Sequence, residues 1–350
     1  MNVNSRIEGI LAQFLARQER IITDIDPALE EYASAVNDFI LKGGKRVRPV
    51  FAYWAARAAG ASDSEELLTC VSGLELLQAS ALIHDDLIDD SNTRRGAPSV
   101  HRRFESLHRL HRWSGSGRDF GSAAAILLGD LCMAWSDELF TGSGMGPDAL
   151  LRARPDFDRM RTEVSAGQYL DILAEFRRDV SRETAMKVAR FKAAKYTIER
   201  PMLVGASLAG ADAELKRRFS DFGLPLGEAF QLRDDILGVF GDPAQTGKPA
   251  GDDLREGKHT YLIAVAWENS SPTGRELITQ RLGDPELTEA QITRLRDVLE
   301  ETGARRETEE RIDRLTEDAE TAFERLKSDI DPESVPVFER LLVKAVKRDA

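Results

Sequence analysis

The sequence has little cysteine, few aromatic residues and no long uninterrupted apolar segment. Its two cysteines, Cys70 and Cys132, are too few for a disulfide framework among 350 residues, and neither has metal-ligand spacing. No apolar run approaches the roughly 18 residues that span a bilayer, and the N-terminus lacks the apolar region of a signal peptide. These absences predict a soluble protein without a transmembrane segment, located in the reduced cytoplasm.

The sequence also has no excess of basic over acidic residues. The 48 basic and 60 acidic residues give a net charge of −12, which argues against binding to nucleic acid or to an anionic membrane surface. An anionic ligand would therefore need local basic clusters or metal ions to hold it.

Helical patterning dominates the chain. Apolar residues recur at spacings of three and four in 7–21, 66–83 and 290–327, whereas no sustained alternation and no hairpin signal is found. Gly and Pro clusters mark breaks that are too short for interdomain linkers. The sequence predicts one all-α domain over residues 1–350.

Aspartates gather after an apolar run in "SALIHDDLIDD" (80–90). Asp85 and Asp89 share one face of a helix, with Asp86 and Asp90 on the adjoining face. Like charges at this spacing destabilise a helix by roughly 0.2–0.5 kcal/mol per pair, and Mg²⁺ would remove that cost because it prefers oxygen ligands. A lone pair would more simply be a solvated helix end. A second cluster, Asp234 and Asp235, and a further carboxylate, Asp171, favour a metal site built from facing helices.

Basic residues accompany the acidic clusters. "KGGKRVRP" (42–49) places Lys45, Arg46 and Arg48 after a Gly-Gly turn, and Arg94 and Arg95 follow the first aspartates. Further lysines stand near the other clusters: Lys192, Lys195, Lys248 and Lys258. Each alone is more typical of a solvated surface. Interleaved with carboxylates, they indicate a site that holds Mg²⁺ and a diphosphate together.

These motifs, in this order over roughly residues 41–262, resemble those of the trans-isoprenyl diphosphate synthases (polyprenyl synthetases), in particular geranylgeranyl diphosphate synthases. "GGKRVRP" is similar to the family's isopentenyl diphosphate motif, and "DDLID" (85–89) to its first aspartate-rich motif, with "RRG" at the usual place after it. "GQYLD" (167–171) is similar to Gly-Gln-x-x-Asp, "FQLRDD" (230–235) to the second aspartate-rich motif, and "GKPAGDDLREGK" (247–258) to the lysine-bearing segment.

The resemblance implies an isoprenoid synthase fold, with about ten or more helices around a deep central cavity, usually as a homodimer. It implies about three Mg²⁺ ions per active site, ligated by Asp85, Asp89, Asp171 and Asp234 and supported by Asp86 and Asp235. Other residues would bind the two substrates. The allylic prenyl diphosphate would contact Arg94, Lys192, Lys248 and Lys258. Isopentenyl diphosphate would contact Lys45, Arg48, Arg95 and Gln78. Gln231 would line the reacting centre.

Three positions depart from the family pattern. Gln78 stands where His is common, Ala193 where Thr commonly follows the central lysine, and Gly238 where the second motif usually ends in Asp. None of these changes removes an indispensable ligand, although metal at the second motif would rest on Asp234.

The implied reaction is Mg²⁺-dependent head-to-tail (1'-4) condensation of isopentenyl diphosphate with an allylic diphosphate. The growing chain would pass the helix face upstream of Asp85, formed by Leu74, Leu77, Ser80 and Ala81. Small residues at Ser80 and Ala81 predict an open first layer and a C20 product, geranylgeranyl diphosphate. Close packing by another helix would also explain their size. Farnesyl (C15) and longer (C25 and above) products remain alternatives.

Two other functions are open to such a chain. A class I terpene cyclase shares the first aspartate motif, but its second motif requires Ser or Thr and Glu where Gly238 and Asp242 stand, and it needs no "GGKRVRP". A non-catalytic synthase subunit typically lacks first-motif aspartates or the basic residues, and both are present here.

Overall fold

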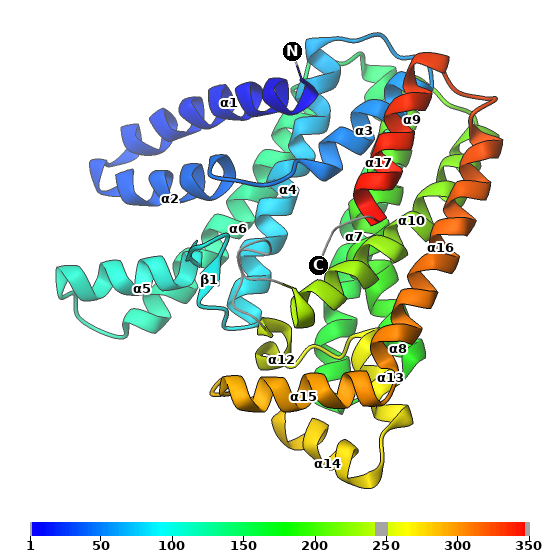
Figure 1. Cartoon of the computed structure of the whole chain (residues 1–350). Helices are drawn as coiled ribbons and strands as arrows, with labels where there is room; N and C mark the ends of the chain where they lie inside the picture. The colour runs from blue at the N-terminus through cyan, green and yellow to red at the C-terminus, as the bar shows by residue number, and fades with distance from the viewer. Residues whose placement is uncertain (1, 242–250, 347–350) are drawn as a thin grey trace. The chain divides into compact units, whose positions relative to one another are not determined.

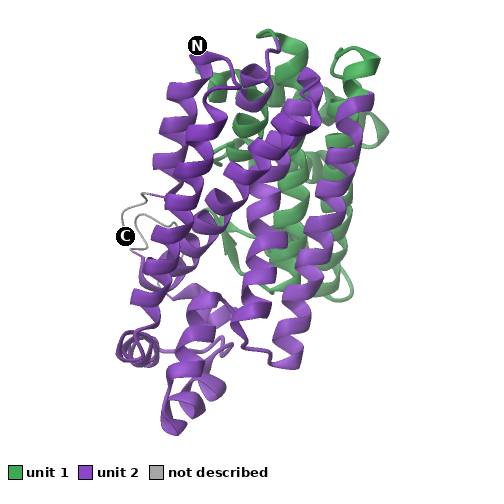
Figure 2. Cartoon of the chain, turned by 90° about the vertical axis from the view of Figure 1, so that its right-hand side faces the viewer, with its two compact units in different colours: residues 1–53, 62–150 green, residues 54–61, 151–350 purple. Residues whose placement is uncertain are grey.

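The computed structural model describes residues 2–241 and 251–346, and most of them are helical. The prediction of an all-α fold is therefore confirmed. The chain forms two compact units, one of residues 1–53 and 62–150 and one of residues 54–61 and 151–350 (Figure 2). We call them unit 1 and unit 2. Helices α3 (Val47–Ala58) and α7 (Pro147–Arg177) run from one unit into the other.

Unit 1 is built on α4, which carries the first aspartate cluster (Figure 1). Its other elements are α1 (Val3–Ile25), η1 (Pro27–Leu29), α2 (Glu30–Leu41), β1 (Thr93–Arg94), β2 (Ala97–Pro98), α5 (Val100–His111) and α6 (Gly117–Thr141). Helix α4 (Glu65–Ile88) begins after Ser64, whose side chain accepts a hydrogen bond from the Leu67 amide at 3.1 Å. Such a cap satisfies a helix-end donor that would otherwise lack a partner.

Helices α4 and α6 approach closely because a glycine lies at their contact. A Cβ on Gly73 would lie 2.8 Å from the carbonyl oxygen of Ser136, whose hydroxyl donates to the Gly73 carbonyl at 2.7 Å. An 18-residue window of α4 has a mean hydropathy of 1.4, enough to cross a membrane by length and composition. Because 72% of this window is buried, α4 has the burial of a core helix. The sequence prediction missed this segment because polar residues interrupt it.

A short hairpin in unit 1 was also missed. Strands β1 and β2 pair antiparallel around Arg95 and Gly96, whose φ angles are 55° and 76°. Two positive φ values in a two-residue loop define a tight turn that glycine favours at its second position. Each strand has only two residues, so no alternating pattern announces it. The hairpin explains why "RRG" follows the aspartates: it turns Arg94 back toward α4.

Unit 2 surrounds α10 (Ala213–Phe240), which packs against η2 and α16. Its other elements are α8 (Arg182–Val188), the π-helix η2 (Ala189–Glu199), α9 (Arg200–Ala209), α12 (Asp252–Glu256), α13 (Tyr261–Asn269), α14 (Pro272–Arg281), α15 (Glu289–Glu301), α16 (Ala304–Leu326), η3 (Pro332–Ser334) and α17 (Val335–Val346).

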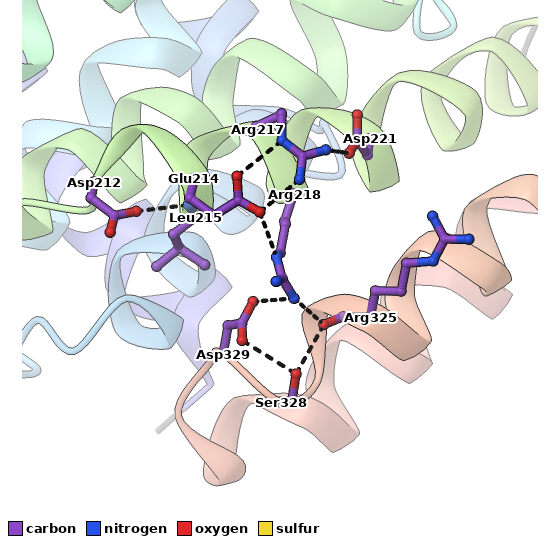
Figure 3. Close-up of polar contacts among 9 residues, drawn as sticks. All are labelled: Asp212, Glu214, Leu215, Arg217, Arg218, Asp221, Arg325, Ser328 and Asp329. Atoms are coloured by element: carbon purple, nitrogen blue, oxygen red, sulfur yellow. Dashed lines mark hydrogen bonds and ion pairs between the residues drawn. The ribbon is translucent and has the colours of Figure 1, made fainter.

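Polar contacts anchor the N-terminal end of α10 (Figure 3). Asp212 caps the helix by accepting from the Leu215 amide at 2.8 Å. Arg218 donates to the carbonyl oxygen of Arg325 at 2.9 Å and pairs with Asp329 at 2.5 Å. The contacts of Arg218 tie the first turns of α10 to the C-terminal end of α16, and Asp212 caps the start of α10. The helix that carries the second aspartate cluster is thus anchored at its N-terminal end.

Candidate active site

The first acidic cluster lies at the C-terminal end of α4. Asp85 and Asp89 are partly exposed, whereas Asp86 is fully buried. Arg94 donates from Nε to Asp86 Oδ1 at 2.7 Å and from Nη2 to the same oxygen, and its Nη2 lies 3.8 Å from Asp85 Oδ2. Burial would be costly for an unpaired carboxylate. Arg94 therefore holds Asp86 inside, while Asp85 and Asp89 stay partly exposed to solvent.

Asp90 differs from the sequence prediction. Helix α4 ends at Ile88 and Asp90 has φ 52°, so it does not share a helical face with Asp86. Its side chain instead pairs with Arg102 at 2.9 Å and lies 3.6 Å from Arg118. Asp90 is thus directed away from the outer carboxylates, toward the basic residues of α5 and α6.

The basic turn before α3 brings several arginines together. Lys45 is exposed, Arg48 is half-buried in the first turn of α3, and Arg95 donates from Nη1 to the carbonyl oxygens of Phe39 and Gly43, both at 3.1 Å. Desolvation lowers the pKa of Arg95 and Glu75 opposes this, while nearby positive charges lower it further: Arg46, Arg94 and Arg48. So dense a positive cluster favours an anionic ligand.

In unit 2 the carboxylate of "GQYLD" faces a lysine. Lys192, on η2, donates from Nζ to Asp171 Oδ2 on α7 at 2.6 Å. This pair forms because α7 and η2 nearly touch: a Cβ on Gly167 would lie 2.4 Å from the Lys192 backbone nitrogen. Gly167 has an ordinary helical φ, so its role is steric. π-Helices are rare and often occur at functional sites, and the sequence pattern did not reveal this one.

The second acidic cluster lies near the C-terminal end of α10. Asp234 is half-buried and Asp235 is buried, and Gln231 donates from Nε2 to Asp235 Oδ1 at 2.7 Å. Lys258 lies 2.6 Å from Glu256 and 3.3 Å from Asp253. Lys248 and Asp242 lie outside the described residues. The cluster thus combines carboxylates with a nearby ammonium group, as at Asp171.

Asp253, which sequence reasoning missed, lies beside Gly238, the residue that departs from the family's second motif. A Cβ on Gly238 would lie 1.8 Å from Asp253 Oδ2, and Asp253 is itself buried. Gly238 therefore has no room for the aspartate that commonly ends the motif, and a carboxylate from α12 stands next to that position. The absence of a side chain at 238 was the only signal in the sequence.

The pKa of Asp235 is raised to about 8, first by burial and then by the negative charge of Asp253, with a smaller rise from Asp234. The hydrogen bond from Gln231 and the charge of Lys258 act in the opposite direction. A carboxyl group that holds its proton so far above the usual pKa of about 3.9 is uncharged in the metal-free protein at neutral pH.

This shift predicts a pH-dependent stability. Between about pH 4 and about pH 8, folded Asp235 keeps its proton while the unfolded chain loses it, so the stability of the folded protein falls steadily across this range and levels off above the folded pKa. We expect Asp235→Asn to raise the Tm of the metal-free protein progressively from about pH 5 to about pH 8. Thermal denaturation in a chelating buffer measures this. A difference between the two proteins that does not change with pH would contradict it.

The residues assigned to chain length do not share one environment. Ser80, Leu77 and Leu74 are buried, and Ser80 has no exposed surface, whereas Ala81 is partly exposed. Ser80 lies seven residues after Gly73 and hence on the same side of α4, which packs on α6. This placement agrees with close helix packing as a reason for the small Ser80 side chain. Ala81 shares a stripe with Gln78 and Asp85.

Gln78 lies two turns before Asp85 on this stripe. Its Oε1 is buried and accepts no hydrogen bond within the described part of the chain. A buried acceptor without a partner costs free energy, so a ligand donor or a water molecule would relieve it. An amide can serve here in place of the more common histidine because it offers both donors and an acceptor.

The donor sets suit Mg²⁺. Within residues 2–241 and 251–346, no group of three or more His, Cys, Asp or Glu side chains could hold a metal ion by itself. Mg²⁺ is commonly bound by one or two carboxylates plus water and substrate phosphates. Asp85 and Asp89 provide two carboxylates on one helix face, and the adjacent arginines provide charge for a phosphate, so these residues fit a metal that binds together with a diphosphate.

Comparison with known proteins gives consistent matches. Residues 30–299 match the family model described as polyprenyl synthetase. A geranylgeranyl pyrophosphate synthase from Corynebacterium glutamicum, solved in complex with isoprenyl diphosphate and magnesium, is 40% identical with a TM-score of 0.94 and full coverage of both chains. Geranylfarnesyl diphosphate synthase of Aeropyrum pernix is 32% identical (88% of this chain, 92% of that protein), and octaprenyl diphosphate synthase of Escherichia coli 30% (67% and 66%).

Proposed function

Because this chain belongs to the polyprenyl synthetase family and is a prenyltransferase, we propose that it condenses isopentenyl diphosphate with an allylic diphosphate in head-to-tail (1'-4) order. The observation that carries the proposal is the cluster at the end of α4, where Arg94 neutralises buried Asp86 and leaves Asp85 and Asp89 partly exposed. Outer carboxylates for metal and cations for phosphate are the combination that diphosphate chemistry requires.

Asp85, Asp89, Asp171 and Asp234 would hold Mg²⁺, which supplies Lewis-acid stabilisation of the departing diphosphate. Asp86 and Asp235 support these positions from the interior. Arg94, Lys192 and Lys258 carry positive charge to the leaving group, and Lys248 is assigned to it from the sequence motif. Lys192 donates to Asp171 at 2.6 Å, and its ammonium group would contact the diphosphate with Asp171 serving as a metal ligand.

Lys45, Arg48, Arg95 and Gln78 would hold isopentenyl diphosphate while its double bond attacks the allylic cation. The proton lost afterwards passes to the released diphosphate, which is held next to the reacting carbons. Gln231 is fixed by its bond to Asp235 and lines this centre. Ala193 leaves no hydroxyl beside Lys192, so stabilisation of the cation rests on the diphosphate.

We assign the product as geranylgeranyl diphosphate (C20). Ala81 lies on the same stripe of α4 as Asp85 and gives the chain room beyond fifteen carbons, while Leu77 and Leu74 are bulkier side chains further upstream. Ser80, which is buried on α4, would form the first layer together with Ala81. The relatives include C20, C25 and octaprenyl synthases, so product length has to be measured.

The test is incubation of purified protein with Mg²⁺, radiolabelled isopentenyl diphosphate and each allylic primer in turn, followed by sizing of the dephosphorylated products. A dominant C20 alcohol that disappears with a chelator supports the assignment. C15 or C25 alone would retain the condensation and refute the C20 assignment. Absence of any metal-dependent product would refute the proposed function.

We further propose that residues 1–350 act as one soluble, cytoplasmic domain, because the family match at 30–299 extends through both units. A homodimer is proposed through the outer face of α6. Exposed apolar side chains lie on the solvent-facing side of α6 over about two helical turns: Ile126, Leu127 and Met133. Faces of this kind mark association surfaces, and a two-fold dimer uses the same face twice.

This assignment predicts that Leu127→Glu weakens dimerisation by about 100-fold, since two buried carboxylates would meet at the interface. Light scattering across a dilution series measures the dimer Kd. Leu110→Glu is the matched control, because Leu110 is 76% exposed on α5 and lies outside the α6 face. A Kd that moves equally in both variants would contradict the use of α6.

A further inference from the structure

The basic turn contains a cation that cannot reach a ligand. Arg46 is 1% exposed, and its guanidinium donates from Nη1 to Glu75 Oε1 and from Nη2 to the Ile40 carbonyl, both at 2.7 Å. Its Nε lies 3.9 Å from the carboxylate of Glu8. Glu75, on α4, is 5% exposed. Of the three cations in "GGKRVRP", Arg46 is thus enclosed by the protein, whereas Lys45 is exposed and Arg48 is half-buried.

The turn is shaped around this ion pair. Gly43, Gly44 and Arg46 all have positive φ, of 115°, 106° and 51°, a region that non-glycine residues seldom adopt. A Cβ on Gly44 would lie 2.9 Å from Arg46 Nη1 and 3.1 Å from Glu75 Oε1. The backbone at Gly44 thus covers the pair directly, and the unusual conformation persists because the arginine is bonded beneath it.

Two further contacts hold the same turn from outside. Arg95 donates to the carbonyl oxygens of Phe39 and Gly43, and Asn4 donates from Nδ2 to the Lys45 carbonyl at 3.5 Å. These groups are at least partly exposed, whereas Arg46 and Glu75 are buried. The buried pair is therefore the contact that is least weakened by solvent.

Glu75 also relates the turn to the aspartate cluster. It precedes Gln78 by three residues and Asp85 by ten, which is about 15 Å along the α4 axis. A turn bonded to Glu75 is thus fixed at a set distance from the carboxylates at the end of the same helix. In a two-substrate condensation that distance determines how the two diphosphates lie relative to each other.

We propose that the buried Arg46–Glu75 pair is a positioning device that presents Lys45 and Arg48 to isopentenyl diphosphate at a fixed distance from the first aspartate cluster. The inference rests on the proposed function, because it assigns these two cations to that substrate. Neither Arg46 nor Glu75 touches a substrate. Loss of the pair would leave Lys45 and Arg48 in place but no longer ordered, so binding would bear the cost of ordering them.

The test separates positioning from stability. Removing one partner leaves a buried unpaired charge, whereas replacing both by apolar side chains of similar volume often preserves stability. We therefore compare Glu75→Gln with the double variant Arg46→Met, Glu75→Leu. In the condensation of farnesyl diphosphate with isopentenyl diphosphate, we expect the double variant to have a Tm within about 5 °C of wild type. Its KM for isopentenyl diphosphate should rise about 10- to 50-fold, and its KM for farnesyl diphosphate should stay within about threefold.

Asp156→Asn is the matched control. Asp156 is a buried carboxylate that pairs with Lys216 at 2.5 Å and accepts from Ser207 at 2.7 Å. It lies fifteen residues, or about 22 Å, before Asp171 on α7. This variant should lower Tm and leave both KM values unchanged, because its ion pair supports no substrate-binding turn.

Each outcome is decisive. An unchanged KM for isopentenyl diphosphate in an active, folded double variant would overturn the positioning role while leaving the proposed function intact. Equal rises in both KM values would likewise overturn it. If the double variant does not fold, Glu75→Gln provides the test. Its KM for isopentenyl diphosphate should rise while its KM for farnesyl diphosphate stays unchanged, and any other result would overturn the positioning role. A wild-type protein without condensation activity would instead refute the proposed function, and this inference with it.

Discussion

Asp85→Ala is expected to lower kcat of the condensation by about a thousandfold, corresponding to about 4 kcal/mol of lost transition-state stabilisation. The reason is that Asp85 and Asp86 have different roles at the end of α4: Asp85 is assigned to the metal, and Asp86 is bonded to Arg94 in the interior. Asp86 is buried and bonded to Arg94, so it cannot move outward to replace a lost metal ligand. Steady-state kinetics at saturating Mg²⁺ measure the effect, and circular dichroism checks that the fold is retained.

Asp90→Asn is the control for this prediction, because Asp90 belongs to the same sequence cluster but pairs with Arg102. Asparagine tolerates the left-handed backbone at this position, so kcat should change by less than about threefold. A loss at Asp90 as large as the loss at Asp85 would show that total negative charge, rather than the outward-facing pair, carries the activity. A kcat of Asp85→Ala close to that of wild type at saturating Mg²⁺ would argue that Asp85 contributes metal affinity and not catalysis.

Gly238→Asp is expected to damage the protein, although it introduces the residue that commonly ends the second motif. Its Cβ would lie 1.8 Å from Asp253 Oδ2 and 2.5 Å from Asp253 Cγ. The new carboxylate would also add negative charge beside buried Asp235 and Asp253. We expect the free energy of unfolding to fall by about 3 kcal/mol or more, as measured by urea denaturation, and kcat to fall at least about tenfold because the turn of α10 carrying Asp234 must shift.

Two further variants isolate the steric cause. Gly9→Ala on α1, where nothing lies within 4 Å of the new Cβ, should stabilise the protein by about 0.5–1 kcal/mol, because alanine favours helices. Gly238→Ala should destabilise it, and adding Asp253→Ala should recover part of the loss. A gain in activity from Gly238→Asp would mean that Asp253 moves aside and that the aspartate completes a metal site.

Much of the fold was predictable from the sequence, because helical periodicity is a local property. The features that escaped prediction depend on contacts distant in the chain. The β1–β2 hairpin is too short to have a pattern, and the end of α4 before Asp90 is fixed by backbone conformation and by Arg102. The π-helix η2 is shaped by contacts with α7 and α10, which no local propensity reports.

The sequence identified the motifs of the candidate site, but not the buried residues that support them. Asp85, Asp86 and Arg94 lie close to one another, and Asp171 pairs with Lys192, although the sequence assigned both cations to a substrate. Sequence reasoning missed Glu75 and Asp253. Glu75 did carry a signal, since it is a single charged residue within the apolar stretch "GLELLQ", and a buried charge normally has a partner. Asp253 was signalled only indirectly, by the missing side chain at Gly238.

The close approach of η2 to its neighbours has a consequence for how the sequence can vary. A Cβ added at Gly167 would lie 2.4 Å from the Lys192 backbone nitrogen, and one added at Gly227 would lie 2.6 Å from the Ala194 carbonyl oxygen. Both glycines have helical φ, for which alanine would ordinarily be preferred. In a library of random single substitutions, positions 167 and 227 should therefore be depleted of every other residue, alanine included. Such a map would trace the path of η2 through unit 2 without a structure.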